Sequence, residues 1–540
     1  MNWRYIITLL ALLPFENPAQ GYMVRGALTL DQLTATADIV FKGTATSSVA
    51  GNGQWDGANQ KTEFKIISVV KGQSPGDSLN FFHYDKVSPE GIEGYEPQHY
   101  HFEPGRTYLV FAKRAERYFE PLWTRPTVKQ DQGVILCADD KPVSAKTVKD
   151  VVWSELTRLL QSSKGGDVCY AVNELDQMSG GGWGDAGQRR FDTVLDFDRK
   201  DVVEAVHGFV TNPDQGVAQA AISVIGSHNP YMSEERAPFW LATVGSADTQ
   251  GLVKMNPKMI NLGGDLYWHD LVAAADGKSD DETRALAIAA LGLVREKALE
   301  KPLERWLTDP SPAVRSSATV LLADFPDMAT HDRLNTLAAD PDPAVRASAA
   351  RSIGFAQQTA EADLLSKLLG DQDAKVRRAA MMSLLSFSPK DDSVAAIFKA
   401  NLNNQEFTPL FLLALARENP APYLDGLVKE MEQNAVPANW AGGETPWFAA
   451  RQILFKYLQA QPFEQVTSGK LDRYLDAIDK AALNTNGVPI YIYAFYVQRG
   501  MTERAKTFRQ AAKKAFPYLP DASFNQVDKN PLLYKGASDG

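Results

Sequence analysis

The sequence predicts a multidomain α+β protein in which a small N-terminal β-barrel is followed by an α-α superhelical solenoid. Two observations lead to this fold class. The first is a phrase that recurs every thirty-one residues, as DPSPAVRSSATVLLA from 309, DPDPAVRASAARSIG from 340 and DQDAKVRRAAMMSLL from 371. The second is a series of short β-branched and aromatic runs, broken by turn-forming residues, that fills the chain up to about residue 160.

Residues 1–21 have the features of a secretory signal peptide. A positive charge within the first four residues precedes the apolar run YIITLLALLPF, and Ala19-Gln20-Gly21 offers small residues at a cleavage site. The run is too short to cross a bilayer about 30 Å thick, and no later stretch is longer and as apolar, so we expect no membrane span. A buried N-terminal strand is the alternative. The signal peptide predicts a bacterial protein that is periplasmic or secreted.

Residues 22–162 form the predicted β-domain. Its strands are expected in ADIVFKGTATS, TEFKIISVVKG, DSLNFFHYD, RTYLVFAKR and GVILCAD, and SAKTVKDVVWSELTRLLQSS is expected to form a closing helix. The series ADIVFKGTAT, FKIISVVKG and FEPGRTYLVFA, followed by a Cys, resembles the bacterial netrin-like, or TIMP-like, OB-fold domain. The resemblance implies an OB-like barrel.

The same resemblance raises protease inhibition as an alternative function. The inhibitors of this family begin the mature chain with a Cys that chelates the zinc of the protease. The mature chain expected here begins near Tyr22, so chelation by the N-terminus does not carry over. A shared fold does not by itself carry a shared function.

Residues 163–195 are predicted to be a linker, because SGGGWGDAGQRR is rich in Gly and no repeating apolar face is evident. Gly182, Gly184 and Gly187 have the spacing of a dinucleotide-binding fingerprint. That motif needs a strand before it and a helix after it, and NELDQMSGG is not typical of a strand. We therefore predict no nucleotide site and no cofactor.

Residues 196–405 are predicted to form the solenoid. Val345, Ala349 and Ile353 lie four residues apart and so share one helical face. We call this helix of each unit the inner helix and the helix upstream of it the outer helix. A two-helix unit cannot bury its apolar face alone, so the units must stack. The recurring apolar columns are Val314, Val345 and Val376; Ala287, Ala318, Ala349 and Ala380; Leu291, Leu322, Ile353 and Leu384; and, on outer helices, Leu303, Leu334 and Leu365, with Trp306, Leu337 and Leu368.

An aspartate precedes each of three inner helices, at Asp309, Asp340 and Asp371. Each carboxylate is predicted to cap the free amides of the first helical turn, and Pro310 and Pro341 follow where no amide is needed. The sequence pattern D-P-x-x-x-V-R-x-x-A resembles the HEAT-like repeat that is also found in phycobilisome lyases. The resemblance implies a repeat solenoid, and it leaves a bilin-lyase-like or other small-molecule enzyme as an alternative function.

The repeat weakens on both sides of the regular copies. A looser copy, NPDQGVAQAAISVIGS, begins at Asn212, and the interval to the copy at 280 leaves room for one degenerate unit. Residues 406–525 keep a helical period without the register and are predicted to cap the solenoid, with 526–540 as a tail.

One arginine recurs in each repeat, at Arg284, Arg315, Arg346 and Arg377. Such a ladder can grip an acidic partner, because guanidinium groups pair with carboxylates in a bidentate way. Acidic residues also stand beside every arginine. The favoured interpretation is therefore that each arginine bridges to a neighbouring carboxylate, such as Asp342 or Asp373, and fixes the stacking of the repeats.

Three of the seven histidines, His83, His99 and His101, lie in the β-domain near Asp85. A His-x-His pair on a strand points both rings to one face, which suits zinc or copper. The surrounding EGYEPQHYHFEPG is more typical of a loop with solvated histidines, so no metal is predicted.

Only two cysteines are present, Cys137 and Cys169. In an exported chain, a lone pair most simply forms one disulfide. Two buried free thiols are the alternative.

Charge and motifs narrow the function. The net charge is −10 and no basic run is present, which excludes a typical nucleic-acid binder. No G-x-S-x-G, H-E-x-x-H or C-x-x-C motif occurs. The sequence thus favours an exported non-catalytic scaffold or adaptor that binds a protein or peptide on the concave face of the solenoid. It gives no indication of the oligomeric state.

Overall fold

The computed structural model describes residues 28–55, 58–85, 100–114, 119–120, 122, 133–145, 147–179, 196–226, 262–292, 294–433, 446–461, 470–483 and 489–530. The described residues up to 337 form one compact unit, the N-terminal unit, and those from 338 onward form a second, the C-terminal unit. The predicted signal peptide and the glycine fingerprint lie outside the described residues.

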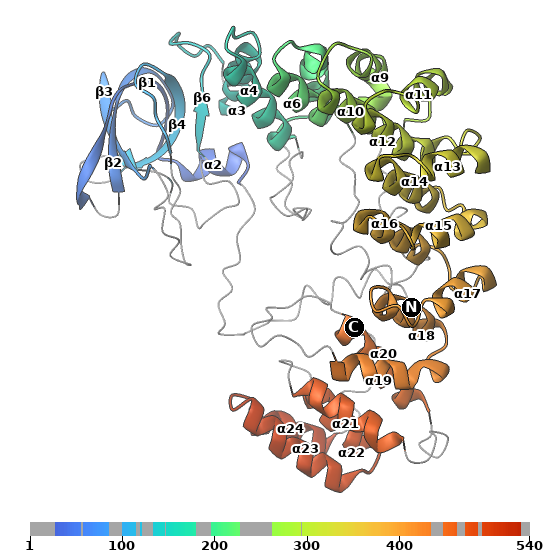
Figure 1. Cartoon of the computed structure of the whole chain (residues 1–540). Helices are drawn as coiled ribbons and strands as arrows, with labels where there is room; N and C mark the ends of the chain where they lie inside the picture. The colour runs from blue at the N-terminus through green and yellow to red at the C-terminus, as the bar shows by residue number, and fades with distance from the viewer. Residues whose placement is uncertain are drawn as a thin grey trace. The chain divides into compact units, whose positions relative to one another are not determined.

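The N-terminal unit begins with the predicted β-barrel (Figure 1). Strands β1, β2, β3, β5 and β4 close on themselves, because β1 also pairs with β4, and β6 adds to β4. Aromatic rings fill the interior, with Phe64 in contact with Phe41, Phe81 and Phe102. A short helix precedes the barrel. The bounds are α2 Leu30–Thr36, β1 Ile39–Trp55, β2 Ala58–Lys71, β3 Ser78–His83, β4 Thr107–Arg114, β5 Phe119–Glu120 and β6 Val134–Leu136.

Two helices cover one side of the barrel. The closing helix is confirmed as α3, Val148–Leu159, capped by the Thr147 hydroxyl. The linker prediction is wrong over Gly165–Met178, which forms helix α4. Val168, Val172 and Leu175 are buried on one face of α4 with the 4-3 spacing of a helix. The glycines at both ends of the segment masked this apolar face in the sequence.

Helix pairs continue the N-terminal unit. The bounds are α5 Arg199–Val206, α6 Gln215–Ile225, α9 Leu262–Ala275, α10 Asp281–Ala290, α11 Glu300–Trp306, α12 Pro312–Leu321 and α13 His331–Ala338. Most of the residues that are expected to form a degenerate unit between α6 and α10 lie outside the described residues. Helix α6 packs on α10. A Cβ atom on Gly226, just after α6, would lie 2.7 Å from Ala290 Cβ, so glycine permits this close approach.

The C-terminal unit is entirely helical in its described part. The bounds are α14 Pro343–Phe355, α15 Ala362–Leu368, α16 Ala374–Leu385, α17 Asp392–Ala400, α18 Thr408–Glu418, α19 Leu424–Gln433, α20 Pro446–Ala460, α21 Leu471–Ala482, α22 Pro489–Gln498, α23 Thr502–Ala515 and α24 Asp521–Lys529. Inner helices α14 and α16 lie side by side, with outer helices α15 and α17 behind them (Figure 1). A Cβ on Gly354 would lie 2.8 Å from Ser383 Cβ, which repeats the arrangement at Gly226.

The predicted repeat columns form the solenoid core. Every valine, alanine, leucine and isoleucine of the three inner columns has no exposed surface, and the Leu303, Leu334 and Leu365 column is equally buried. Each buried valine, leucine or isoleucine side chain contributes about 1.5–3 kcal/mol on burial. Since no single helix pair encloses these residues, stacking is what stabilises the repeats.

The predicted helix caps are two residues too early. Helix α14 is capped by Asp342 and α16 by Asp373, whose carboxylates accept the amides of Ala344 and Lys375. Asp309, Asp340 and Asp371 lie outside the helices. One carboxylate oxygen of each accepts the N–H two residues further on, at 2.8–2.9 Å, from Ser311, Asp342 and Asp373. These aspartates shape the loop, and the other oxygen of Asp309 and of Asp371 accepts a hydrogen bond from an arginine of the preceding repeat.

Candidate functional site

The arginine column connects successive repeats. Arg346 pairs with Asp371 of the next repeat through two bonds, Nε to Oδ2 at 2.8 Å and Nη2 to Oδ1 at 2.9 Å. Arg284 Nη2 lies 2.6 Å from Asp309 Oδ2, and Arg377 Nε lies 2.9 Å from Glu406 Oε2. The Arg346 guanidinium, by hydrogen bonding, lowers the pKa of the Asp371 carboxyl.

The same arginines also donate hydrogen bonds to the loop that precedes their own helix. Arg346 Nη1 donates to the carbonyls of Asp340 and Pro341, at 3.0 and 3.1 Å. Arg315 and Arg377 make the equivalent bonds to the carbonyls at 309 and 310 and at 371 and 372. The arginine column is therefore architectural. Between repeats, the carboxylates that these arginines are seen to pair with are those of Asp309, Asp371 and Glu406, rather than the predicted Asp342 and Asp373.

Within each unit, the inner helices also have a solvent-facing side opposite their buried columns, on α10 and α12 in the N-terminal unit and on α14 and α16 in the C-terminal unit. We call it the inner-helix stripe. Its exposed or half-buried members recur at the same interval: Glu282 and Ala289 on α10, Ala313, Ser316 and Val320 on α12, Ala344 and Arg351 on α14, and Lys375, Arg378 and Met382 on α16. Most are small or apolar. Within the C-terminal unit, the charged members of the stripe are all cations.

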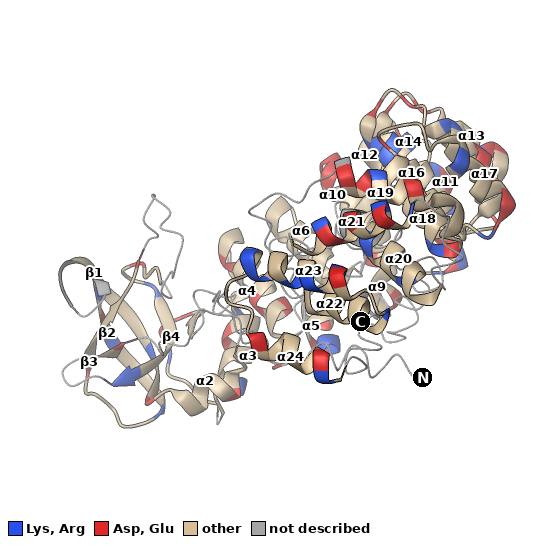
Figure 2. Ribbon diagram, turned by 90° about the horizontal axis from the view of Figure 1, so that it is seen from below, with Lys and Arg blue, Asp and Glu red and all other residues tan. Residues whose placement is uncertain are grey.

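Charges of both signs are interspersed over the described helices, without a long run of one sign (Figure 2). None of the helices in the described ranges combines the length and apolar character needed to cross a membrane.

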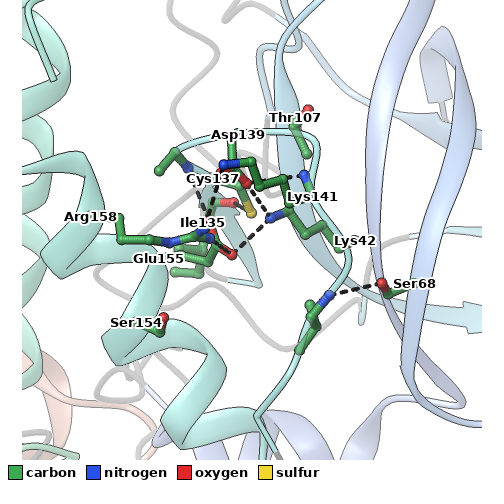
Figure 3. Close-up of polar contacts among 12 residues, drawn as sticks. Lys42, Ser68, Thr107, Ile135, Cys137, Asp139, Lys141, Ser154, Glu155 and Arg158 are labelled. Atoms are coloured by element: carbon green, nitrogen blue, oxygen red, sulfur yellow. Dashed lines mark hydrogen bonds and ion pairs between the residues drawn. The ribbon is translucent and has the colours of Figure 1, made fainter.

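A buried ion pair joins the barrel to α3 (Figure 3). Lys42, on β1, is 0% exposed, and its Nζ lies 2.8 Å from Oε1 of Glu155, which is 3% exposed. Asp139 lies 3.2 Å from the same ammonium group. Arg158 contacts both carboxylates, and the Ala138 amide donates to Glu155 Oε2 at 3.0 Å. Every charged group in this cluster is therefore paired, as burial requires.

Further polar contacts continue this connection to α4 and α5. The Tyr170 hydroxyl of α4 accepts the Leu136 amide of β6 at 3.2 Å, and Arg106 lies 2.6 Å from Asp167. The buried Asp196, just before α5, accepts the Leu30 amide at the start of α2. Helix α4 also packs on α6. The β-domain is thus built onto the first solenoid helices, rather than tethered by a flexible linker.

The sequence contains a signal for this ion pair that our prediction missed. Lys42 interrupts the apolar run IVFKG of a strand, and Glu155 stands at a buried position of α3, four residues after Val151. Opposite charges at two positions that periodicity assigns to the interior indicate a buried pair.

The described histidines do not form a metal site. His83 is buried in the barrel, with Nε2 2.8 Å from the Thr62 hydroxyl, and burial lowers its pKa. His101 is exposed, and its Nδ1 lies 2.9 Å from Asp85. His99 lies outside the described residues. Among the residues that the structure describes, no group of three or more His, Cys, Asp or Glu could hold a metal ion.

The predicted disulfide is not formed: Cys137 and Cys169 are both free. Cys137 follows β6 and is buried, with its thiol directed to the Ile135 carbonyl. Burial raises its pKa. Cys169 lies on α4 and is directed to the Gly216 carbonyl of α6. The two thiols face different neighbours, so the alternative of two free thiols holds, but only Cys137 is buried and Cys169 is partly exposed.

The repeats have known relatives. Residues 269–339 and 330–408 match the family model for HEAT repeats. The predicted HEAT-like solenoid is thereby confirmed. No curated protein gives a significant match.

Solved structures with weak similarity include two engineered proteins and a chain from a Pds5–Scc1 complex. The first engineered protein is 17% identical, with 45% of this chain and 96% of the other covered and a TM-score of 0.27. The second is 15% identical, with coverages of 70% and 97% and a TM-score of 0.29. The Pds5–Scc1 chain is 12% identical, with coverages of 73% and 75% and a TM-score of 0.24. The fold assignment rests on the repeat match and the buried columns.

Proposed function

We propose that this protein is an exported, non-catalytic adaptor that binds a protein or peptide along the inner-helix stripe. The observation that carries the proposal is the stripe itself, in which solvent-facing positions recur on α10, α12, α14 and α16. Repeat solenoids present extended surfaces of this kind to macromolecules. The arginine column is occupied by contacts within and between repeats, whereas the stripe faces solvent.

In the C-terminal unit, the charge of the stripe favours a partner segment that carries acidic side chains. The cation that carries this argument is Lys375, which is exposed on α16 beside α14. The apolar Met382 stands one turn from Arg378 on the same side of α16. A segment that combines carboxylates with apolar side chains would complement both features, and charge complementarity would give specificity and a faster association.

Export is part of the proposal and is supported by residues 1–21. The charge, apolar run and small residues there have the order of a cleavable signal peptide. The free cysteines carry no support for an oxidising compartment. The netrin-like resemblance of the β-domain likewise remains a proposal about its family.

Affinity capture by the full chain from a bacterial envelope fraction tests this function. Two variants are compared with the wild type: Lys375→Glu/Met382→Glu on the stripe of α16, and Lys399→Glu on the exposed side of outer helix α17. We expect a protein that is retained by wild type and Lys399→Glu but lost from the stripe variant. Equal retention by all three would contradict the stripe as the binding surface. A coloured or small-molecule ligand that co-purifies in stoichiometric amounts would instead favour a lyase-like enzyme.

A further inference from the structure

The first strand of the barrel has two halves with different neighbours. Residues Ile39–Thr44 of β1 pair with β2 on one side and with β4 on the other. Ala45 ends the contact with the β4 side, where it bonds to Arg106 and Gly105. A bulge follows at Thr46, between Ala45 and Ser47. Beyond the bulge, residues 47–50 pair with β2, and none of residues 46–50 pairs with another described strand.

This half-paired edge is backed by an ordered sheet. Ser48 pairs with Thr62 of β2, which pairs with Phe81 of β3, so three strands lie in register. Hydrogen bonds of 2.9 Å from Ser48 to Thr62 and 2.8 Å from Thr62 to His83 connect the side chains across all three strands. The edge is thus held in an extended conformation before any partner arrives, which lowers the entropic cost of binding.

Apart from the bulge at Thr46, the edge shows, among the described residues, none of the usual features that block strand addition. Natural sheets protect exposed edges with charged residues, prolines, covering segments or bulges. The opposite edge strand of this domain, β6, is covered, since the Tyr170 hydroxyl of α4 takes the Leu136 amide. The sequence of residues 46–50 is TSSVA, with no charge and no proline, and only its first residue, Thr46, lies in the bulge. Val49 is 51% exposed there.

From these observations we infer that residues 46–50 of β1 are a strand-addition site for an extended, uncharged segment of a partner polypeptide. Successive residues of a strand direct their N–H and C=O groups to alternate edges, so two or three residues present a donor and an acceptor to the open side. Only an extended backbone matches that spacing. A β-branched or apolar side chain in the added segment would pair with Val49.

The occupant is a flexible segment rather than a second copy of this chain. Five residues of strand span only about 17 Å, and pairing two such edges buries far less than the roughly 1,000 Å² that a stable interface needs. A peptide needs no such area, because strand addition in peptide-recognition domains uses a short edge. The site belongs to the β-domain and stands independently of the inner-helix stripe.

Selection of phage-displayed random dodecapeptides on the immobilised full chain tests the site. We expect enriched peptides with alternating β-branched residues that bind with micromolar affinity. Backbone amide exchange should slow at residues 46–50 when a synthetic copy of an enriched peptide is added. Ser48→Pro and Val49→Pro each remove one amide, and one of the two amides faces the open edge. The proline variant that removes the amide on the open edge should bind the peptide at least about tenfold more weakly, since one or two backbone hydrogen bonds to the peptide are lost. Val49→Thr should keep binding because it keeps the amide.

The outcomes separate this site from the stripe. Enriched peptides whose binding is unchanged in both proline variants, or reduced by Lys375→Glu/Met382→Glu, would overturn the strand-addition site while leaving the stripe as a binding surface. Failure to enrich any peptide over the Ser48→Pro and Val49→Pro proteins would also overturn it. If a proline variant fails to fold, the exchange measurement on the wild type decides, because protection must fall within residues 46–50.

Discussion

Lys42→Met gives the sharpest test of how the β-domain is built onto the solenoid. The substitution keeps the volume of the side chain but leaves Glu155 buried without its ammonium partner. Removing one member of a buried pair costs about 3–5 kcal/mol. Glu155 would retain Arg158 and the Ala138 amide, so we expect the low end of this range, about 3 kcal/mol. That corresponds to a roughly hundredfold larger equilibrium constant for opening.

Amide exchange of the full chain measures this effect locally. Protection of β4 and α3 should fall together in Lys42→Met, because the ion pair joins the barrel to α3, while protection of α16 should not change. The double variant Lys42→Met/Glu155→Met should be nearer to wild type than the single variant, since no unpaired charge is left at either position. A change below about 0.5 kcal/mol in the single variant, or additive losses in the double variant, would refute the reasoning.

Three further predictions follow from the repeats and the thiols. Asp371→Asn should destabilise the C-terminal unit at neutral pH, and this difference from the wild type should vanish in acid. The pKa of the folded carboxyl is lowered, so the carboxylate stabilises the fold above its unfolded pKa of about 3.9, and this stabilisation is lost as the pH falls through the folded pKa. Urea melts from pH 2 to 7 measure the difference, and a difference that does not change with pH would contradict the reasoning. Gly354→Ala should lower the free energy of unfolding by about 1–3 kcal/mol, because its Cβ would meet Ser383, whereas Gly166→Ala, where no atom lies within 4 Å, should be neutral or stabilising in the same thermal melts. Of the two thiols, Cys169 should react with a disulfide reagent in the native protein and Cys137 only after unfolding, because burial raises its pKa; equal rates would contradict the burial of Cys137.

The solenoid was predictable because the same pattern of apolar positions recurs in every repeat. The apolar residues at Val345, Ala349 and Ile353 each recur several times at one interval, so the assignment of a position to the core does not depend on any single copy. The same columns are fully buried in the structure. Helix α4 occurs once, and the glycines around it outweighed the spacing of Val168, Val172 and Leu175, so it was missed.

The parts that depend on long-range partners were less predictable. The aspartates at 309, 340 and 371 have the spacing of helix caps, yet each shapes its loop, and two of them pair with an arginine twenty-five residues earlier. Local sequence contains no information on that distance. Likewise, whether Cys137 is free or bonded depends on the direction in which the Cys169 side chain points. The open edge of β1 can be recognised only when the residue at which pairing with β4 ends is known.

Lysine footprinting of the complex captured from the envelope tests the central claim most directly. Acetylation rates of Lys375 on α16 and Lys399 on α17 are compared with and without the bound partner. The inner-helix account predicts that Lys375 becomes protected while Lys399 reacts at its former rate. Protection of Lys399 alone, or of neither residue, would contradict it.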